Sequence, residues 1–119
     1  MMRLENFYWE IGSDYATVLE RFSDDKEMLE HFVTTFPNDE TMNNIRIAVQ
    51  NNDDKAIEET THALKGITAN LAFNQLYAAC SKLVETIRHR RKEDIQKDFA
   101  TVEQEYTIIV DHIEHFKDK

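Results

Sequence analysis

The sequence contains very little glycine, proline or cysteine. Of its 119 residues, two are glycine, one is proline and one is cysteine. Sheet proteins of this length need many tight turns, and such turns draw on glycine and proline. The composition therefore argues against sandwiches and barrels, and against glycine-rich loops that cradle nucleotide phosphates. The single cysteine, Cys80, permits no internal disulfide, which is typical of proteins from a reducing compartment.

Positive charge and long apolar runs are also scarce. The chain carries 14 Lys and Arg residues against 23 Asp and Glu residues, for a formal net charge of -9. Such a surface repels nucleic acid and anionic membranes, so we expect neither as a partner. No apolar run approaches the roughly 20 residues that span a bilayer. The first residues, Met1 to Glu5, lack the apolar stretch of a signal peptide, and we expect a cytoplasmic protein.

A basic run from Arg88 to Lys92 interrupts the acidic pattern. Our first interpretation is a solvated helix end, because cations are favourable near the negative end of the helix dipole. A docking role for the same run is the alternative.

Apolar residues recur at helical spacing through almost the whole chain. The length fits one core, so we predict that residues 1–119 form a single domain. Asp24 with Glu27 resembles a capping box, Asn74 is the expected cap of a later helix, and Pro37 could end, kink or open a helix. Long amphipathic helices with short links pack as antiparallel neighbours, which predicts an all-α up-down bundle. The expected helices are Leu4 to Trp9, a short one after Ser13 or Asp14, one after Asp24, Met42 to Val49, Lys55 to about Leu71, Asn74 to about Arg90, and Lys92 to Phe116. The same spacing places one apolar face on the helix after Asp24, made of Met28, Leu29, Phe32, Val33 and Phe36. On the helix from Asn74 it predicts the buried residues Leu76, Tyr77, Cys80, Leu83, Val84 and Ile87.

The expected helix from Lys55 to Leu71 has an unusual outer face. At about 100° per residue, one side gathers its apolar residues and threonines and is predicted to meet the core. His62 and Gly66 lie roughly 160° from the centre of that side, Ala69 about 140° and Lys65 about 100°. The core side comprises Ile57, Thr60, Thr61, Leu64, Ile67, Thr68 and Leu71.

Small residues on an outward helix face need a physical reason. Gly66 in a helix interior costs about 1 kcal/mol relative to alanine. It would clear space for a partner to approach His62, while Lys65, three residues on, could neutralise an anion there. An unperturbed histidine has a pKa near 6.5, so the neutral imidazole dominates at pH 7. An open neutral imidazole beside a cation suits a nucleophile for a phosphoryl group.

The segment from His62 to Ala72 reads His-Ala-Leu-Lys-Gly-Ile-Thr-Ala-Asn-Leu-Ala. It resembles the signature of histidine-containing phosphotransfer (HPt) domains, His-x-Leu-Lys-Gly, then small residues, then Asn-Leu-Gly. The similarity extends over nearly the whole chain. It includes Leu76, Cys80 and Leu83 on the following helix, and upstream the run from Asp14 to Phe22, Asp25 and Phe36-Pro37.

The resemblance implies an up-down antiparallel four-helix bundle with an additional N-terminal helical segment. It makes His62 the phosphoacceptor of a multistep phosphorelay, with Lys65 supporting the phosphate and Gly66 giving a receiver domain access. The expected partners are response-regulator receiver domains and a hybrid histidine kinase, and the expected state is a monomer. Such a protein is a phosphoryl carrier rather than an enzyme. It has no ATP site or cofactor of its own, and the Mg²⁺ belongs to the receiver.

Three positions depart from the family pattern. Ala72 replaces the usual glycine after Asn70-Leu71, and Ile67 stands where a small residue is common. Val84 takes the place of a Glu or Gln that often hydrogen-bonds near the acceptor histidine, although Ser81 and Glu85 are close in sequence. The last departure bears on how the imidazole is oriented.

Other functions remain open from sequence. A helical adaptor that binds partners without phosphotransfer is the main alternative. Glu59-x-x-His62 matches half of a di-iron motif, but no second copy occurs and His62 is expected to point outward. His112 and His115 offer too few ligands for a dedicated metal site.

Two further features are explained by packing alone. Cys80 is expected to be a small core residue rather than a reactive thiol. The aromatic residues Phe7, Tyr8 and Trp9 are predicted to cover one end of the bundle, with a docking surface as the alternative.

Overall fold

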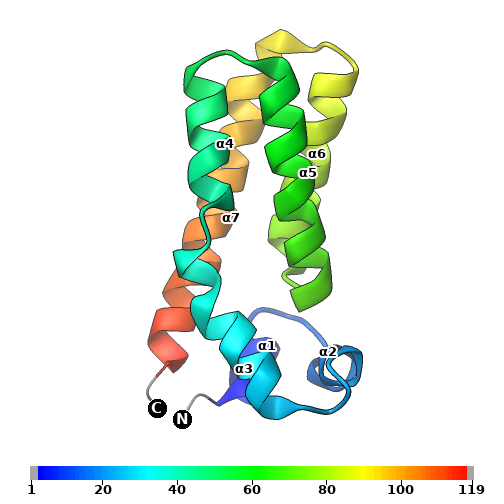
Figure 1. Ribbon diagram of the computed structural model, residues 1–119, viewed down its shortest axis with the longest axis vertical. Helices are drawn as coiled ribbons and strands as arrows, with labels where there is room; N and C mark the ends of the chain where they lie inside the picture. Colours follow the sequence, from blue (N-terminus) through cyan, green and yellow to red (C-terminus); the bar gives the residue numbers. More distant parts are fainter. Residues whose placement is uncertain (1–2, 118–119) are drawn as a thin grey trace.

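The computed structural model describes residues 3–117, which contain helices and no strands. The predicted all-α class is therefore confirmed for this part of the chain. The helices appear in Figure 1 and run in the order α1 Leu4–Glu10, α2 Tyr15–Arg21, α3 Lys26–Thr35, the 3-10 turn η1 Phe36–Asn38, α4 Thr41–Gln50, α5 Asp54–Leu71, α6 Asn74–Arg88, η2 Lys92–Asp94 and α7 Ile95–Phe116.

Helices α4, α5, α6 and α7 form the predicted up-down antiparallel bundle (Figure 1). α5 packs against α4 on one side and α6 on the other, and α6 packs against α7. Their apolar faces meet in one core, and the buried Thr86 hydroxyl donates a hydrogen bond to Asp98 that joins α6 to α7. In residues 3–117 no helix is both long and apolar enough to cross a membrane.

The three N-terminal helices cover the lower end of this bundle, where the long α7 extends to meet them (Figure 1). The rings of Phe7 and Tyr8 are fully buried, and Phe7 packs edge-to-face on Phe73 at 5.9 Å and on Phe116 at 6.4 Å between ring centroids. The prediction of an aromatic cover is confirmed for these two residues. It is wrong for Trp9, which is 79% exposed because it lies on the outer side of α1.

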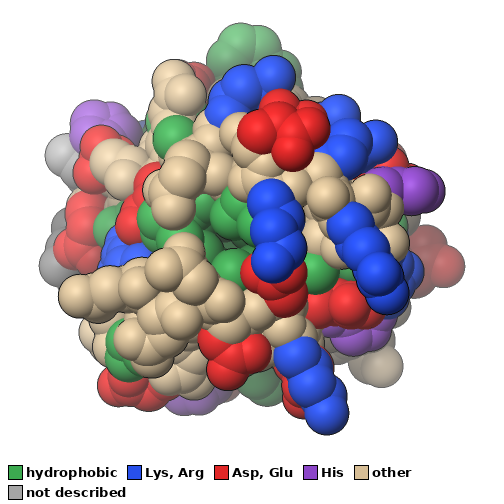
Figure 2. Space-filling view, turned by 90° about the horizontal axis from the view of Figure 1, so that it is seen from above, with side chains coloured by type: hydrophobic (Ala, Val, Ile, Leu, Met, Phe, Trp, Pro, Cys, Tyr) green, Lys and Arg blue, Asp and Glu red, His purple; other side chains and the backbone are tan. Residues whose placement is uncertain are grey.

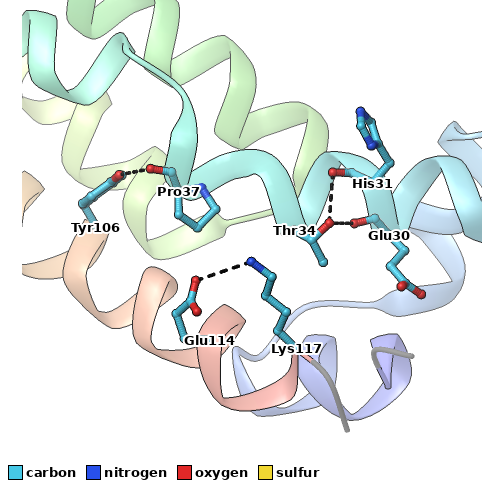
Figure 3. Close-up of polar contacts among 7 residues, drawn as sticks. All are labelled: Glu30, His31, Thr34, Pro37, Tyr106, Glu114 and Lys117. Carbon is cyan, nitrogen blue, oxygen red and sulfur yellow. Dashed lines mark hydrogen bonds and ion pairs between the residues drawn. The ribbon is translucent and has the colours of Figure 1, made fainter.

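Pro37 lies in the first turn of η1, between α3 and α4. In the last turn of α3, the Thr34 hydroxyl donates to the carbonyl oxygens of Glu30 and His31 at 2.8 and 3.3 Å (Figure 3). The Tyr106 hydroxyl, from α7, donates to the Pro37 carbonyl at 3.5 Å. The proline thus ends one helix and redirects the chain along α7 into the next.

Helix starts differ from the sequence-based expectations at three places. The cap of α3 is Asp25, whose carboxylate accepts from the Met28 N–H at 3.0 Å, because Asp24 adopts a left-handed φ of 60°. Asn74 is the first residue of α6 rather than its cap, and its amide donates to the Ser13 hydroxyl at 3.2 Å. The last helix begins at Ile95, because the 3-10 turn η2 occupies the residues from Lys92.

The C-terminus of α5 is closed by two devices. Ala72 adopts a left-handed φ of 58°, and the N–H of Phe73 then donates to the Thr68 carbonyl at 2.9 Å. This is the ending that a glycine adopts without steric strain, so the alanine keeps the geometry of the family pattern. In addition, the Arg21 guanidinium of α2 donates to the Ala69 carbonyl at 2.7 Å, which fastens α2 to α5.

The upper end of the bundle carries the basic run. Figure 2 shows Lys and Arg side chains interleaved with Asp and Glu on this end. Arg88 pairs with Glu58 at 2.9 Å, Lys92 with Asp54 at 3.6 Å, and Arg91 with Asp94 at 3.8 Å. The run therefore lies at a solvated helix end whose charges are largely matched by neighbouring carboxylates.

Candidate functional site

The site is built on α5, which begins at a strong cap. The Asp53 carboxylate accepts from the Ala56 N–H at 3.1 Å. The stripe that faces the core comprises Ile57, Thr61, Leu64, Thr68 and Leu71. The predicted core side is thus largely confirmed, except that Thr60 and Ile67 are only half-buried at its edges.

The opposite stripe of α5 is open. His62, Gly66 and Ala69 are all exposed, as the helical angles predict. Among the described residues, the imidazole of His62 makes no side-chain hydrogen bond, so its edge is available to a partner. This openness is the property that a nucleophilic histidine needs.

Gly66 is not required for packing inside the protein. Apart from its chain neighbours and the backbone of its own helix, a Cβ atom built on it would meet no atom within 4 Å. The glycine also has ordinary helical geometry, because its φ is not positive. Close helix packing therefore does not explain it, and the space it leaves faces outward, one turn beyond the His62 ring.

Lys65 leans from α5 toward α6. Its Nζ lies 5.7 Å from the centroid of the Tyr77 ring, and it forms no ion pair within residues 3–117. Burial raises the pKa of the nearby Cys80 thiol to about 12, and the positive charge of Lys65 opposes part of that rise. The periodicity of α6 groups Tyr77 with the buried residues, but this is wrong, because the ring is 37% exposed beneath the ammonium.

A matched ion pair lies one turn before His62 on the same side of α5. Glu58, four residues earlier, pairs through its carboxylate with the Arg88 guanidinium of α6 at 2.9 Å. Residues four apart are neighbours on a helix surface. The Glu58 carboxylate is thus matched by a cation, which lowers its repulsion toward an incoming anion. Glu59, three residues before His62, is exposed and forms no ion pair within residues 3–117.

A groove of about 650 Å³ runs along α5 from Ala63 to Leu71 and includes Gly66, which lies one turn from His62. Phe32 of α3 is 47% exposed in it, although the sequence pattern of α3 placed both Phe32 and Met28 on the buried face. That prediction is wrong because only Leu29, Val33 and Phe36 reach the core. The groove is lined by Arg21, Phe22, Phe32, Ala63, Gly66, Ile67, Ala69, Asn70 and Leu71.

At the position where the family pattern has a Glu or Gln, α6 offers the His62 imidazole no side-chain hydrogen bond. Val84 is fully buried and has no polar group to offer. The Ser81 hydroxyl oxygen is buried and has no hydrogen-bond partner in residues 3–117, and Glu85 is exposed. Ile67 lines the groove, where it adds apolar surface.

The metal alternatives gain no support from the geometry. Over residues 3–117, no group of three or more His, Cys, Asp or Glu side chains could hold a metal ion. His62 of the Glu59-x-x-His62 motif points away from the bundle core, and the His112 ring nitrogen pairs with the Ile108 carbonyl at 2.8 Å.

The chain was compared with known proteins. The family model described as Hpt domain matches residues 27–113, which is well over half of the chain. No curated protein and no solved structure matches it significantly. The match spans α3 through most of α7 and includes the whole of the open stripe on α5. The chain therefore belongs to the Hpt domain family, whose members carry phosphoryl groups on histidine in phosphorelay signalling.

Proposed function

We propose that His62 accepts a phosphoryl group from the aspartate of a receiver domain and passes it to a second receiver. The observation that carries this proposal is the open imidazole on α5, with Lys65 and Gly66 within one turn of it. In this proposal Lys65 supplies positive charge and Gly66 supplies access. The protein acts as a carrier between a hybrid histidine kinase and a response regulator.

The chemistry needs little from this chain beyond position and charge. A lone pair of the neutral His62 ring attacks phosphorus in line, and a P–N bond forms as the P–O bond to the receiver aspartate breaks. The aspartate carboxylate leaves with the electron pair. Charge in the loose transition state is spread over the equatorial oxygens, where a nearby ammonium stabilises it.

The groove along α5 is the surface we propose for receiver docking. It joins the apolar side chains of Phe22, Phe32 and Ile67 to the small residues Ala63 and Gly66, and Gly66 lies one turn from the proposed acceptor. Exposed aromatic surface of this kind favours protein interfaces. A receiver seated there brings its aspartate toward the imidazole without meeting a side chain at Gly66.

We further propose that residues 1–119 form one monomeric domain. Support comes from the core, which draws side chains from every helix from α1 to α7. The terminal residues 1–2 and 118–119 lie outside the described part of the chain. Light scattering after size-exclusion chromatography tests the monomer, and a dimer mass would contradict it.

Phosphotransfer tests the acceptor directly. A receiver charged with ³²P-labelled acetyl phosphate is mixed with the wild type, His62→Gln and the matched control His115→Gln, since His115 is also exposed. We expect acid-labile, base-stable label on the wild type and the control, and none on His62→Gln. Label retained by His62→Gln would refute the assignment, and receiver binding without label on any variant would favour the adaptor.

Receiver affinity tests the docking surface. Phe32→Glu in the groove is compared with Ile47→Glu on α4, because the two side chains are 47% and 48% exposed and Ile47 does not line the groove. We expect calorimetry to show at least about tenfold weaker receiver binding for Phe32→Glu alone, since it places an uncompensated charge in an apolar contact. Gly66→Gln should also weaken binding. Equal affinities for all variants would place the receiver elsewhere.

A further inference from the structure

The ammonium of Lys65 is held by an aromatic ring rather than by a carboxylate. Its Nζ lies 5.7 Å from the centroid of Tyr77, and no ion pair within residues 3–117 includes it. We propose that Tyr77 is a positioning residue, which holds Lys65 beside the acceptor while leaving its positive charge unneutralised. This inference rests on the proposed function of His62 and Lys65.

An aromatic ring holds a cation in a way that a carboxylate cannot. The negative face of the ring attracts the ammonium but carries no net charge. A carboxylate partner would cancel most of the field that Lys65 offers to a phosphoryl group. The chain has 23 acidic residues, so a carboxylate partner would be easy to find. Glu58, one turn before His62 on the same helix, is instead occupied by Arg88.

The packing of α6 against α5 places the Tyr77 ring next to the Lys65 side chain. Tyr77 projects from α6, which packs along α5, and its neighbours Leu76 and Cys80 are buried in the core. The Lys65 ammonium lies over the Tyr77 ring, on the side of α6 that faces α5. Since the Tyr77 hydroxyl forms no hydrogen bond among the described residues, the ring face rather than the hydroxyl holds the lysine.

The contact between Lys65 and Tyr77 is weak enough to be replaced by hydrogen bonds to phosphoryl oxygens. Cation–π contacts at exposed sites are modest, whereas hydrogen bonds between an ammonium and phosphoryl oxygens are charge-assisted and stronger. Lys65 therefore rests on Tyr77 in the free protein and moves to the phosphoryl oxygens once His62 carries them. Tyr77 limits the conformations that the lysine must give up at that step, which helps the transfer.

Rates of transfer from a charged receiver test this role. We expect Tyr77→Leu to slow single-turnover transfer about two- to fivefold, because a lysine freed from the ring gives up more side-chain conformational entropy when it reaches the phosphoryl group. Tyr77→Phe keeps the ring and should transfer at the wild-type rate. In a Lys65→Ala background, Tyr77→Leu should have no further effect. A Phe variant as slow as the Leu variant, or a full Tyr77→Leu effect without Lys65, would overturn the proposal.

Nuclear magnetic resonance tests the contact without any receiver. The methylene protons of Lys65 next to Nζ should be shifted upfield by the Tyr77 ring in the wild type and in Tyr77→Phe, but not in Tyr77→Leu. Phosphoramidate, which transfers its phosphoryl group to histidine with release of ammonia, should move these resonances toward ordinary values. The same reagent on His62→Gln should leave them in place.

The role of Tyr77 and the role of His62 can be refuted separately. Ordinary Lys65 shifts in the free protein would overturn the role of Tyr77, even if His62 is phosphorylated. Upfield shifts that do not change when His62 is phosphorylated would likewise overturn it, because the lysine would then not leave the ring. Label retained by His62→Gln would instead refute the proposed function, whatever the shifts show.

Discussion

Within residues 3–117, two cations rest over aromatic rings, one at each of two helix interfaces. Arg46 of α4 lies with its guanidinium carbon 5.4 Å from the Tyr106 ring centroid of α7, and Lys65 of α5 lies with Nζ 5.7 Å from Tyr77 of α6. Arg46 also makes two hydrogen bonds to the Glu103 carboxylate, each 2.8 Å long. Lys65 has no such partner among residues 3–117.

In our proposal, this difference separates a cation with a structural role, Arg46, from one that acts in transfer, Lys65. The hydrogen-bonded Glu103 raises the pKa of Arg46 and matches its charge, so this pair joins α4 to α7 and offers little field to anything outside. The ring alone leaves the charge of Lys65 uncancelled next to the proposed acceptor. A carboxylate beside the cation, rather than the aromatic contact, marks the structural role.

Removing the unmatched cation should have the largest effect on transfer. We expect Lys65→Ala to slow single-turnover phosphotransfer about ten- to hundredfold, because a positioned charge that stabilises a transition state is worth this much or more. The free energy of unfolding in urea should change by less than about 1 kcal/mol, since the contact is weak and partly exposed. A wild-type transfer rate would remove Lys65 from the mechanism.

Supplying a carboxylate to Lys65 should make it resemble Arg46. Ala69 is exposed one turn further along α5. The substitution Ala69→Glu therefore places a carboxylate four residues from Lys65, within reach on the helix surface. We expect transfer to slow about two- to fivefold relative to Ala69→Gln, which has the same size without the charge. The gap between the two variants should close at high salt, where exposed charges are screened. Equal rates at low salt would show that matching the charge has no consequence.

Removing the matched cation should change stability and leave transfer intact. We expect Arg46→Ala to lower the free energy of unfolding by about 1 kcal/mol, because the pair is well aligned but partly exposed to solvent. Urea denaturation followed by circular dichroism measures the loss, and the transfer assay should give the wild-type rate. A slowed transfer would contradict the division of roles between the two cations.

Helical periodicity was sufficient to predict the bundle and the two faces of α5. Buried and exposed residues alternate along α5 with the period of the helix, so the angular position of His62 and Gly66 gave their exposure directly. The pattern failed on α3, where Leu29 and Phe32 are both apolar and lie three residues apart. Only the packing of α3 at the end of the bundle decides that Leu29 is buried and Phe32 lies in the groove.

Contacts between helices could not be predicted from one sequence. Tyr77 has the spacing of a core residue on α6, and its role depends on how α6 is rotated against α5. The cap of α3 was also beyond local pattern, since Asp24 and Asp25 are the same residue type and the left-handed turn at Ser23 and Asp24 selects the second. The exposed face that carries His62 and Gly66 could be predicted because it is local to one helix. Its surroundings could not, because they come from three others.

The bond from Arg21 to the last turn of α5 has a consequence for recognition. The Arg21 guanidinium ties the side of the groove that α2 forms to the side that α5 forms, so the proposed docking surface is already shaped in the free protein. A receiver domain that binds there meets a preorganised surface, so little conformational entropy is lost on binding. Encounters between signalling proteins can in this way be brief and still productive.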